Sequence, residues 1–181
     1  MIKIIKKYVL LIIIASLIII LDQYTKSLVR TNLVMGEVWS PWEWLTPYAR
    51  IVNWHNTGAA FGIFQGGSSI LAVLAAFVVL VILFYYPRVP NAEWVLRIAL
   101  IMQLGGAVGN LIDRINIGHV TDFISVGTFP VFNIADASIS IGVAVLIIGL
   151  WIQERNEKKG SIGEGKINPN EAASVNGEES I

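Results

Sequence analysis

Two aspartates, Asp122 and Asp136, stand fourteen residues apart in the stretch VTDFISVGTFPVFNIAD. The second lies at the start of a long apolar run, where a carboxylate is costly to bury. Two carboxylates brought close together can share a proton, so that one acts as base on a water molecule and the other as acid. Taken singly, each has a plainer interpretation. Asp122 would be an ordinary loop acid, and Asp136 would help to cap a helix whose N-cap is Asn133.

A second polar group lies in the run GGAVGNLIDR, residues 105–114. Its glycines would allow two helices to approach closely. Asn110, Asp113 and Arg114 fall on one helical face, at spacings of three and four. Asp113 and Arg114 could form an interfacial ion pair, or Arg114 could hold a substrate carbonyl or a phosphate-like group. The run is weak evidence for a nucleotide site, because no strand precedes it and no P-loop lysine follows.

Two further motifs admit both a structural and a functional interpretation. The run NTGAAFG, residues 56–62, is either a turn into the next apolar segment or a flap over a pocket. In the second case Asn56 would offer amide hydrogen bonds to a peptide backbone. Asp22 and Lys26 lie one helical turn apart near the end of the first apolar run, and we expect them to form an internal ion pair.

The composition indicates an integral membrane protein. Of 181 residues, 55% are hydrophobic and 14% charged, whereas soluble domains carry about 25% charged residues. The net charge of +0 gives no general attraction to nucleic acid. There are no cysteines, which excludes disulfides, thiolate zinc sites and a cysteine nucleophile. His55 and His119 are far apart in the sequence and form no HExxH motif, so we expect neither a metal site nor a cofactor.

Four apolar runs are about the length that a bilayer core requires. The first is not read as a cleaved signal peptide, because it ends in Asp-Gln-Tyr and apolar character then resumes. The polar end of the chain is expected to be a disordered cytoplasmic tail. We therefore predict one four-helix domain over residues 1–159 and a tail over 160–181. The predicted spans are residues 8–29, 68–86, 94–112 and 136–152, and residues 113–135 form a connecting segment.

The segment between the first two spans has a different character. It contains Trp39, Trp42, Trp44 and Trp54, and tryptophan favours the membrane–water interface. Residues 50–54 and 60–64 are aromatic and β-branched enough to form strands. The predicted fold is therefore an all-α membrane protein with four transmembrane helices and a small β-rich element on the outer membrane surface.

Charge asymmetry orients these spans. Nine basic residues fall on one side of the predicted membrane and four on the other. The positive-inside rule then places both termini in the cytoplasm. With that orientation most polar residues of the bundle gather at its outer end, which is the predicted site. These residues are Asp22, Lys26, Asn56, Asn110, Asp113, Arg114, Asp122, Asn133 and Asp136.

Five sequence blocks, taken together and in this order, resemble the lipoprotein signal peptidase family, the type II signal peptidases of bacteria. They span residues 22 to 136, and no block departs from the family pattern. The residues after about 159 are not covered by the resemblance. The blocks are DQYTK (22–26), NTGAAF (56–61), GGAVGNLIDR (105–114), VTDFI (120–124) and FNIAD (132–136).

The resemblance implies a metal-free aspartic endopeptidase of the bacterial inner membrane. Its substrate would be a prolipoprotein whose cysteine already carries diacylglycerol, and it would cut just before that cysteine to release the signal peptide. Asp122 and Asp136 would form the catalytic pair. The remaining residues carried over would line, order or support the substrate site: Asn56, Gly106, Asn110, Arg114, Asn133, Asp22 and Lys26.

Two other function classes remain open from the residues alone. A small proton-coupled transporter or channel would use Asp22, Asp113, Asp122 and Asp136 as a relay. That class predicts polar residues through the membrane depth, whereas the second and fourth spans are apolar at their centres. The third class is a noncatalytic membrane scaffold.

Overall fold

The computed structural model describes residues 2–58 and 66–164. The chain divides into two compact units, Met1–Leu146 and Ile147–Ile181. The second unit contains the C-terminal part of one long helix, in which the Arg155 guanidinium lies over the Trp151 ring at 4.2 Å. The first unit contains every predicted site residue.

The described residues contain four long helices, and each is long and apolar enough to cross a membrane. This confirms the four predicted spans. The first, third and fourth helices extend beyond the predicted limits, because a helix does not end where its apolar segment ends, whereas the second keeps the predicted start and ends one residue earlier. Residues 160–164 of the predicted tail continue the fourth helix, and residues 165–181 lie outside the described residues, so a disordered tail stays a prediction for these. The helices are α1 (Ile2–Asn32), α2 (Ser68–Tyr85), α3 (Trp94–Ile117) and α4 (Ile134–Glu164).

Helix α3 is the central helix of the first unit. Half of its most apolar window is buried, against 6% for α2. Leu11 of α1, Ile82 of α2 and Ile101 of α3 belong to one buried cluster. Other apolar side chains point outward, such as Leu17 and Phe77, each 61% exposed. Exposed leucine and phenylalanine on helices of this length suit a lipid environment, where the backbone hydrogen bonds are satisfied within each helix.

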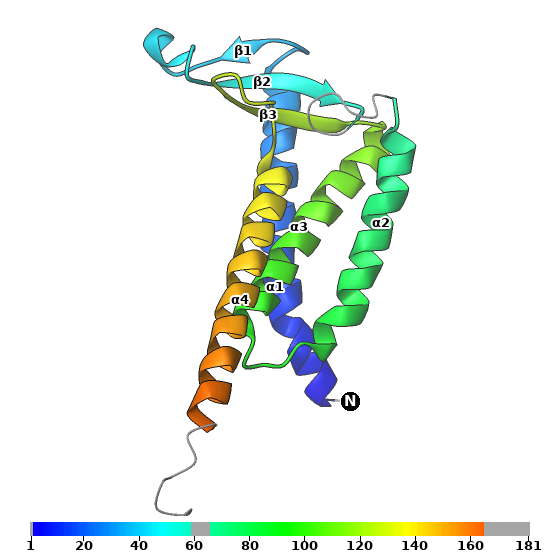
Figure 1. The fold of residues 1–181 in the computed structure, drawn as a ribbon. Helices are drawn as coiled ribbons and strands as arrows, with labels where there is room; N and C mark the ends of the chain where they lie inside the picture. Colours follow the sequence, from blue (N-terminus) through cyan, green and yellow to red (C-terminus); the bar gives the residue numbers. More distant parts are fainter. Residues whose placement is uncertain (1, 59–65, 165–181) are drawn as a thin grey trace, which may run out of the picture. The chain divides into compact units, whose positions relative to one another are not determined.

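An antiparallel sheet lies across the helix ends where α1 and α3 finish and α4 begins (Figure 1). Its strands are β1 (Val38–Trp39), β2 (Ala49–Asn56) and β3 (Val120–Val126), in that order. Strand β2 confirms the strand predicted over residues 50–54. The strand predicted over residues 60–64 lies outside the described residues.

Strand β3 corrects the prediction of one connecting segment over residues 113–135. Helix α3 continues to Ile117, and Gly118 then reverses the chain with a φ of 77°, a value that glycine adopts without strain. Strand β3 follows at once, so Asp122 is a strand residue and not a loop acid. Its neighbours Thr121 and Phe123 are buried as well. The strand therefore lacks the apolar–polar alternation by which a half-buried strand is predicted.

Glycines on α3 allow two other helices to approach it. A Cβ atom on Gly105 would lie 2.9 Å from Ile18 Cβ, and one on Gly109 would lie 2.7 Å from Asp22 Oδ2. A Cβ atom on Gly106 would lie 2.4 Å from the backbone oxygen of Ala135. Gly105 and Gly109 therefore admit α1, and Gly106 admits the first turn of α4, as expected of small residues in membrane helix contacts.

We predict that Gly106→Ala destabilises the protein by about 1–3 kcal/mol, because the added methyl group would meet the backbone of Ala135, which cannot move aside as the side chain of Ile139 can. Thermal unfolding in detergent micelles measures this change. Gly142→Ala is the matched control. Its Cβ would meet Ala99 O at 3.0 Å, and the gain in helix propensity of up to ~1 kcal/mol should offset that milder contact. Equal effects of the two substitutions would contradict the packing role of Gly106.

Candidate active site

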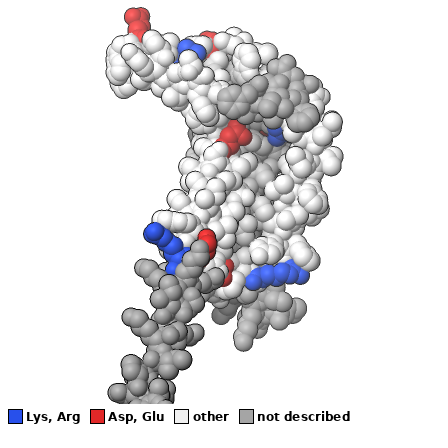
Figure 2. Space-filling view, viewed as in Figure 1, with Lys and Arg blue, Asp and Glu red and all other residues white. Residues whose placement is uncertain are grey.

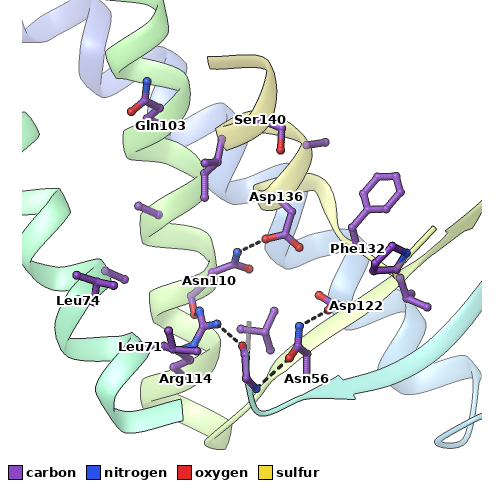
Figure 3. A pocket seen from close by; sticks show the side chains of 18 of the residues that line it. Asn56, Leu71, Leu74, Gln103, Asn110, Arg114, Asp122, Phe132, Asp136 and Ser140 are labelled. Atoms are coloured by element: carbon purple, nitrogen blue, oxygen red, sulfur yellow. Dashed lines mark hydrogen bonds between the residues drawn. The ribbon is translucent and has the colours of Figure 1, made fainter. Parts of the chain in front are cut away.

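A cavity of about 650 Å³ lies among α2, α3, the first turns of α4 and the sheet (Figure 3). Aliphatic side chains of α2 form one wall, and residues 129–132 form another. In the space-filling view the visible hollow contains an acidic and a basic group, and the helical surface below it is largely uncharged (Figure 2). Five of the predicted site residues line this cavity: Asn56, Asn110, Arg114, Asp122 and Asp136.

Asp122 reaches the cavity from β3 and is 1% exposed. One of its carboxylate oxygens accepts a hydrogen bond from Asn133 Nδ2 at 2.7 Å, and the other accepts one from Asn56 Nδ2 at 2.8 Å. Asn56 is the last residue of β2, whose pairing with β3 places Asn56 opposite Val120. The register of the sheet therefore brings Asn56 to Asp122.

Asp136 reaches the cavity from the first turn of α4 and is held by a reciprocal cap. Its backbone N–H donates to Asn133 Oδ1 at 2.9 Å, and the N–H of Asn133 donates to Asp136 Oδ2 at 3.2 Å. Such mutual bonds satisfy N–H groups that a helix start leaves unpaired. The capping interpretation is confirmed, and the same cap fixes the carboxylate at the cavity.

Two asparagines connect the aspartates. Asn110 Nδ2 donates to Asp136 Oδ1 at 2.7 Å, and Asn133 Nδ2 lies 3.1 Å from Asn110 Oδ1 as well as bonding Asp122. Figure 3 shows both carboxylates directed into the same pocket. The connection from Asp122 to Asp136 thus brings the two aspartates into the same pocket.

Behind this pair lies a buried ionic cluster centred on Lys26. Its ammonium group is 2.8 Å from Asp22 Oδ2, 3.2 Å from Asp113 Oδ2 and 2.9 Å from Asn110 Oδ1. The predicted Asp22–Lys26 ion pair is confirmed. Asp113 pairs with Lys26 and, at 3.4 Å, with Arg30, so of the two alternatives for Arg114 the ion pair with Asp113 is not the one formed. All four aspartates of the chain gather at this end of the first unit.

Each aspartate of the ionic cluster also holds the backbone next to a cavity aspartate. Asp22 Oδ1 accepts from the N–H of Ala135 at 3.0 Å, and Asp113 Oδ2 accepts from the N–H of Thr121 at 3.1 Å. Ala135 and Thr121 directly precede Asp136 and Asp122. Sequence reasoning missed both contacts, because a backbone donor leaves no mark in the sequence.

Arg114 faces the cavity from α3. Its guanidinium donates to the backbone oxygens of Gly58 at 3.3 Å and Asn110 at 3.5 Å. Its Nε is buried and has no hydrogen-bond partner among the described residues. A free donor at this position can receive a carbonyl oxygen of a bound molecule.

The surroundings of Asp122 change its acidity. Burial, and after it the nearby charge of Asp136, raise its pKa from 3.8 to about 7, against the lowering effect of the hydrogen bonds from Asn56 and Asn133. A carboxyl group with a pKa of about 7 retains its proton in a large fraction of molecules at neutral pH. The pair is therefore suited to hold one proton between two carboxylates.

The two histidines of the chain meet beside this site. His55 and His119, distant in sequence, lie with ring centroids 3.9 Å apart, because β2–β3 pairing places His55 opposite Thr121. Burial, His119 and Arg30 together lower the pKa of His55. No group of three or more His, Cys, Asp or Glu side chains suited to a metal ion occurs within the residues that the structure describes.

Comparison with known proteins identifies the family. A family model described as signal peptidase (SPase) II matches residues 14–152. The chain belongs to the signal peptidase II family. It is 42% identical over 148 residues to the lipoprotein signal peptidase of Shouchella clausii, covering 81% of this chain and 96% of that one. It is 32% identical over 152 residues to that of Staphylococcus aureus, covering 82% and 91%.

The fold agrees with this membership. A bacterial membrane enzyme solved by the in meso method at 2.3 Å resolution superposes with a TM-score of 0.75 at 31% identity, covering 81% of this chain and 90% of that one. The signal peptidase II member described here is accordingly a multi-pass bacterial membrane protein of a peptidase family. Its predicted fold class, four transmembrane helices with a small sheet, is confirmed.

We predict that Lys26→Met costs about 3–5 kcal/mol of unfolding free energy, because it leaves Asp22 buried without a cation and leaves Asp113 paired with Arg30 alone. Thermal unfolding in micelles measures the loss. Adding Asp22→Asn to Lys26→Met should recover part of it, since one uncompensated charge is removed. Arg50→Met, which removes a cation of β2 outside the cluster, is the control. A double variant no more stable than Lys26→Met alone would argue against the ionic explanation.

The raised pKa of Asp122 predicts a pH-dependent stability. Between pH 3.8 and about 7 the folded protein keeps a proton that the unfolded chain has lost, so stability decreases as pH rises through this window. The asparagine in Asp122→Asn cannot titrate, so this variant does not lose stability in the same pH window. Its stability relative to the wild type should therefore rise with pH, by up to ~4 kcal/mol, and level off above pH 7.

Thermal unfolding of both proteins from pH 4 to 8 makes the comparison. Glu43→Gln, a neutralised carboxyl on the exposed turn η1 (Glu43–Leu45), is the matched control and should follow the wild type throughout. Parallel curves for Asp122→Asn and the wild type would contradict the raised pKa.

Proposed function

We propose that this protein is a membrane aspartic endopeptidase that removes the signal peptide from diacylglyceryl-modified prolipoproteins, cutting just before the lipidated cysteine. The observation on which the proposal depends is that Asp122 and Asp136 share one cavity, each held by asparagine amides. The family membership supports a peptidase, and the names of its relatives support a lipoprotein substrate.

In the proposed reaction a water molecule lies between the two carboxylates. Asp122, with its pKa of about 7, holds the shared proton, and Asp136 acts as the base. Asp136 removes a proton from the water as its oxygen attacks the scissile carbonyl carbon. Asp122 then donates its proton to the leaving nitrogen, and the C–N bond breaks to give a carboxylate and a free amine.

Neighbouring groups would position the peptide. The Nε of Arg114, which has no hydrogen-bond partner within residues 2–58 and 66–164, would donate to a substrate carbonyl. Asn56 donates a hydrogen bond to Asp122 and Asn110 donates one to Asp136, and these bonds would keep the carboxylates directed at the water. These roles require the fixed geometry that the Lys26 cluster provides, because misplacing catalytic groups by about 1 Å can cost a hundredfold in rate.

The apolar part of the cavity fits a lipidated substrate. Leu74 and Val78 of α2 and Ile141 of α4 line it, and such side chains suit acyl chains or an apolar signal helix. The scissile bond would then lie at the end of the bundle with the aspartates, while the lipid remains at the depth of the bilayer.

The proposed orientation has both termini in the cytoplasm and the site at the outer face of the inner membrane. The excess of basic residues on the side of the termini supports it. The relay alternative has less support, because the aspartates gather at one end of the first unit and do not follow the length of its helices.

We predict that Asp122→Asn and Asp136→Asn each reduce cleavage of a diacylglyceryl prolipoprotein by at least about a thousandfold, because residues that act as a unit lose nearly all activity together. The purified variants are assayed in detergent beside the wild type, and thermal unfolding confirms that they are folded. Glu43→Gln is the control and should retain full activity.

The same assay includes an unlipidated prolipoprotein and a chelator. Full activity in the chelator and none on the unlipidated substrate are the expected results. Normal cleavage by either aspartate variant would overturn the proposal. Proton flux into liposomes without any proteolysis would favour the transporter.

A further inference from the structure

One polar side chain in the cavity has no role in the chemistry proposed above. Gln103 lines the cavity from α3, on the helical face that also presents Asn110 and Arg114. It lies at the end of the pocket away from Asp122 (Figure 3). Seven residues separate it from Asn110, which corresponds to about 10 Å along a helix.

The amide nitrogen of Gln103 is buried. Its Nε2 has no hydrogen-bond partner among the described residues. A Cβ atom on Gly142 would lie 3.1 Å from Gln103 Cγ, so close packing against α4 fixes the stem of the side chain. A donor that is desolvated and unpaired is unfavourable in the folded protein, and more so near the middle of a membrane-spanning helix. Gln103 therefore does not serve the stability of the free protein.

We propose that Gln103 donates a hydrogen bond to an ester carbonyl of the diacylglyceryl group on the substrate cysteine. The inference rests on the proposed function and deepens it, because it assigns recognition of the lipid to a particular side chain. Gln103 would be a specificity-determining residue and would take no part in bond cleavage.

The chemistry of the substrate favours the ester. An ester carbonyl accepts hydrogen bonds, and an ester contains no donor that could satisfy it. Backbone carbonyls of a signal helix are instead bonded within the helix, except in its last turn. The ester carbonyls are thus the acceptors of the lipidated substrate that have no hydrogen-bond donor within the substrate itself.

The position of Gln103 fits this role. One cysteine side chain and one glycerol unit separate the scissile bond from the ester. With the scissile bond at the aspartates, this length allows the ester to reach the deeper part of the cavity. Leu74, Ala75 and Val78 of α2 also line the cavity, and they provide apolar contacts for the acyl chains that begin at the ester. The cavity thus offers a hydrogen-bond donor for the ester and aliphatic walls for the acyl chains. This is the order in which these groups follow one another in the lipid.

The test compares two lipopeptides that differ only in the lipid linkage, a diester and the corresponding diether, which lacks the carbonyls. The wild type should cleave the diester with a kcat/KM about three- to tenfold higher, the range expected for one neutral hydrogen bond. Gln103→Met keeps the length of the side chain and removes the amide. It should cleave the two substrates equally, with the diether rate unchanged from the wild type.

Gln153→Met is the matched control, because Gln153 lies on α4 and does not line the cavity. It should keep the preference of the wild type. Gln103→Met should also be at least as stable as the wild type in thermal unfolding, since it removes an unpaired donor.

A wild type without preference for the diester would overturn the inference alone. A Gln103→Met variant whose kcat/KM falls equally on both substrates would also overturn it, because the amide of Gln103 would then contact the peptide part of the substrate. Failure of the wild type to cleave either substrate would overturn the proposed function, and the inference with it.

Discussion

The geometry of the site depends on one buried cation. Lys26 has no exposed surface, and its ammonium group contacts Asp22, Asp113 and Asn110. A buried ammonium is stable only with such partners. Through Asp22 it fixes the start of α4, and through Asp113 it fixes the start of β3. One charge on α1 therefore sets the positions of two aspartates that belong to other elements.

Close helix packing makes this arrangement possible. Gly109 brings Asp22 against α3, and Gly106 brings the first turn of α4 against the same helix. Larger residues at these two positions would separate the helices whose polar groups must meet. The glycines of α3 thus take no part in the reaction, but the helix spacing that they allow determines whether the ionic cluster can form.

Local patterns in the sequence predicted much of the fold. Long apolar runs indicated the helices, spacing of four indicated the Asp22–Lys26 pair, and the cap at Asn133 followed from its place before α4. Strand β3 was missed because burial on both faces removes alternation. The partnership of Lys26 with Asp113 and the contact between the histidines join distant segments. They depend on helix packing and strand register, which no local pattern contains.

The connection between Asp122 and Asp136 is also part of the cavity wall. Phe129, Pro130 and Phe132 line the cavity, and Phe132 is bonded back to Ile124 of β3 through both backbone groups. An ordinary surface connection tolerates insertions. Here an inserted residue would alter the space for a bound molecule and the separation of the two carboxylates at once. The length of this segment is therefore under two constraints together, and changes in pocket shape are expected to arise by substitution and not by insertion.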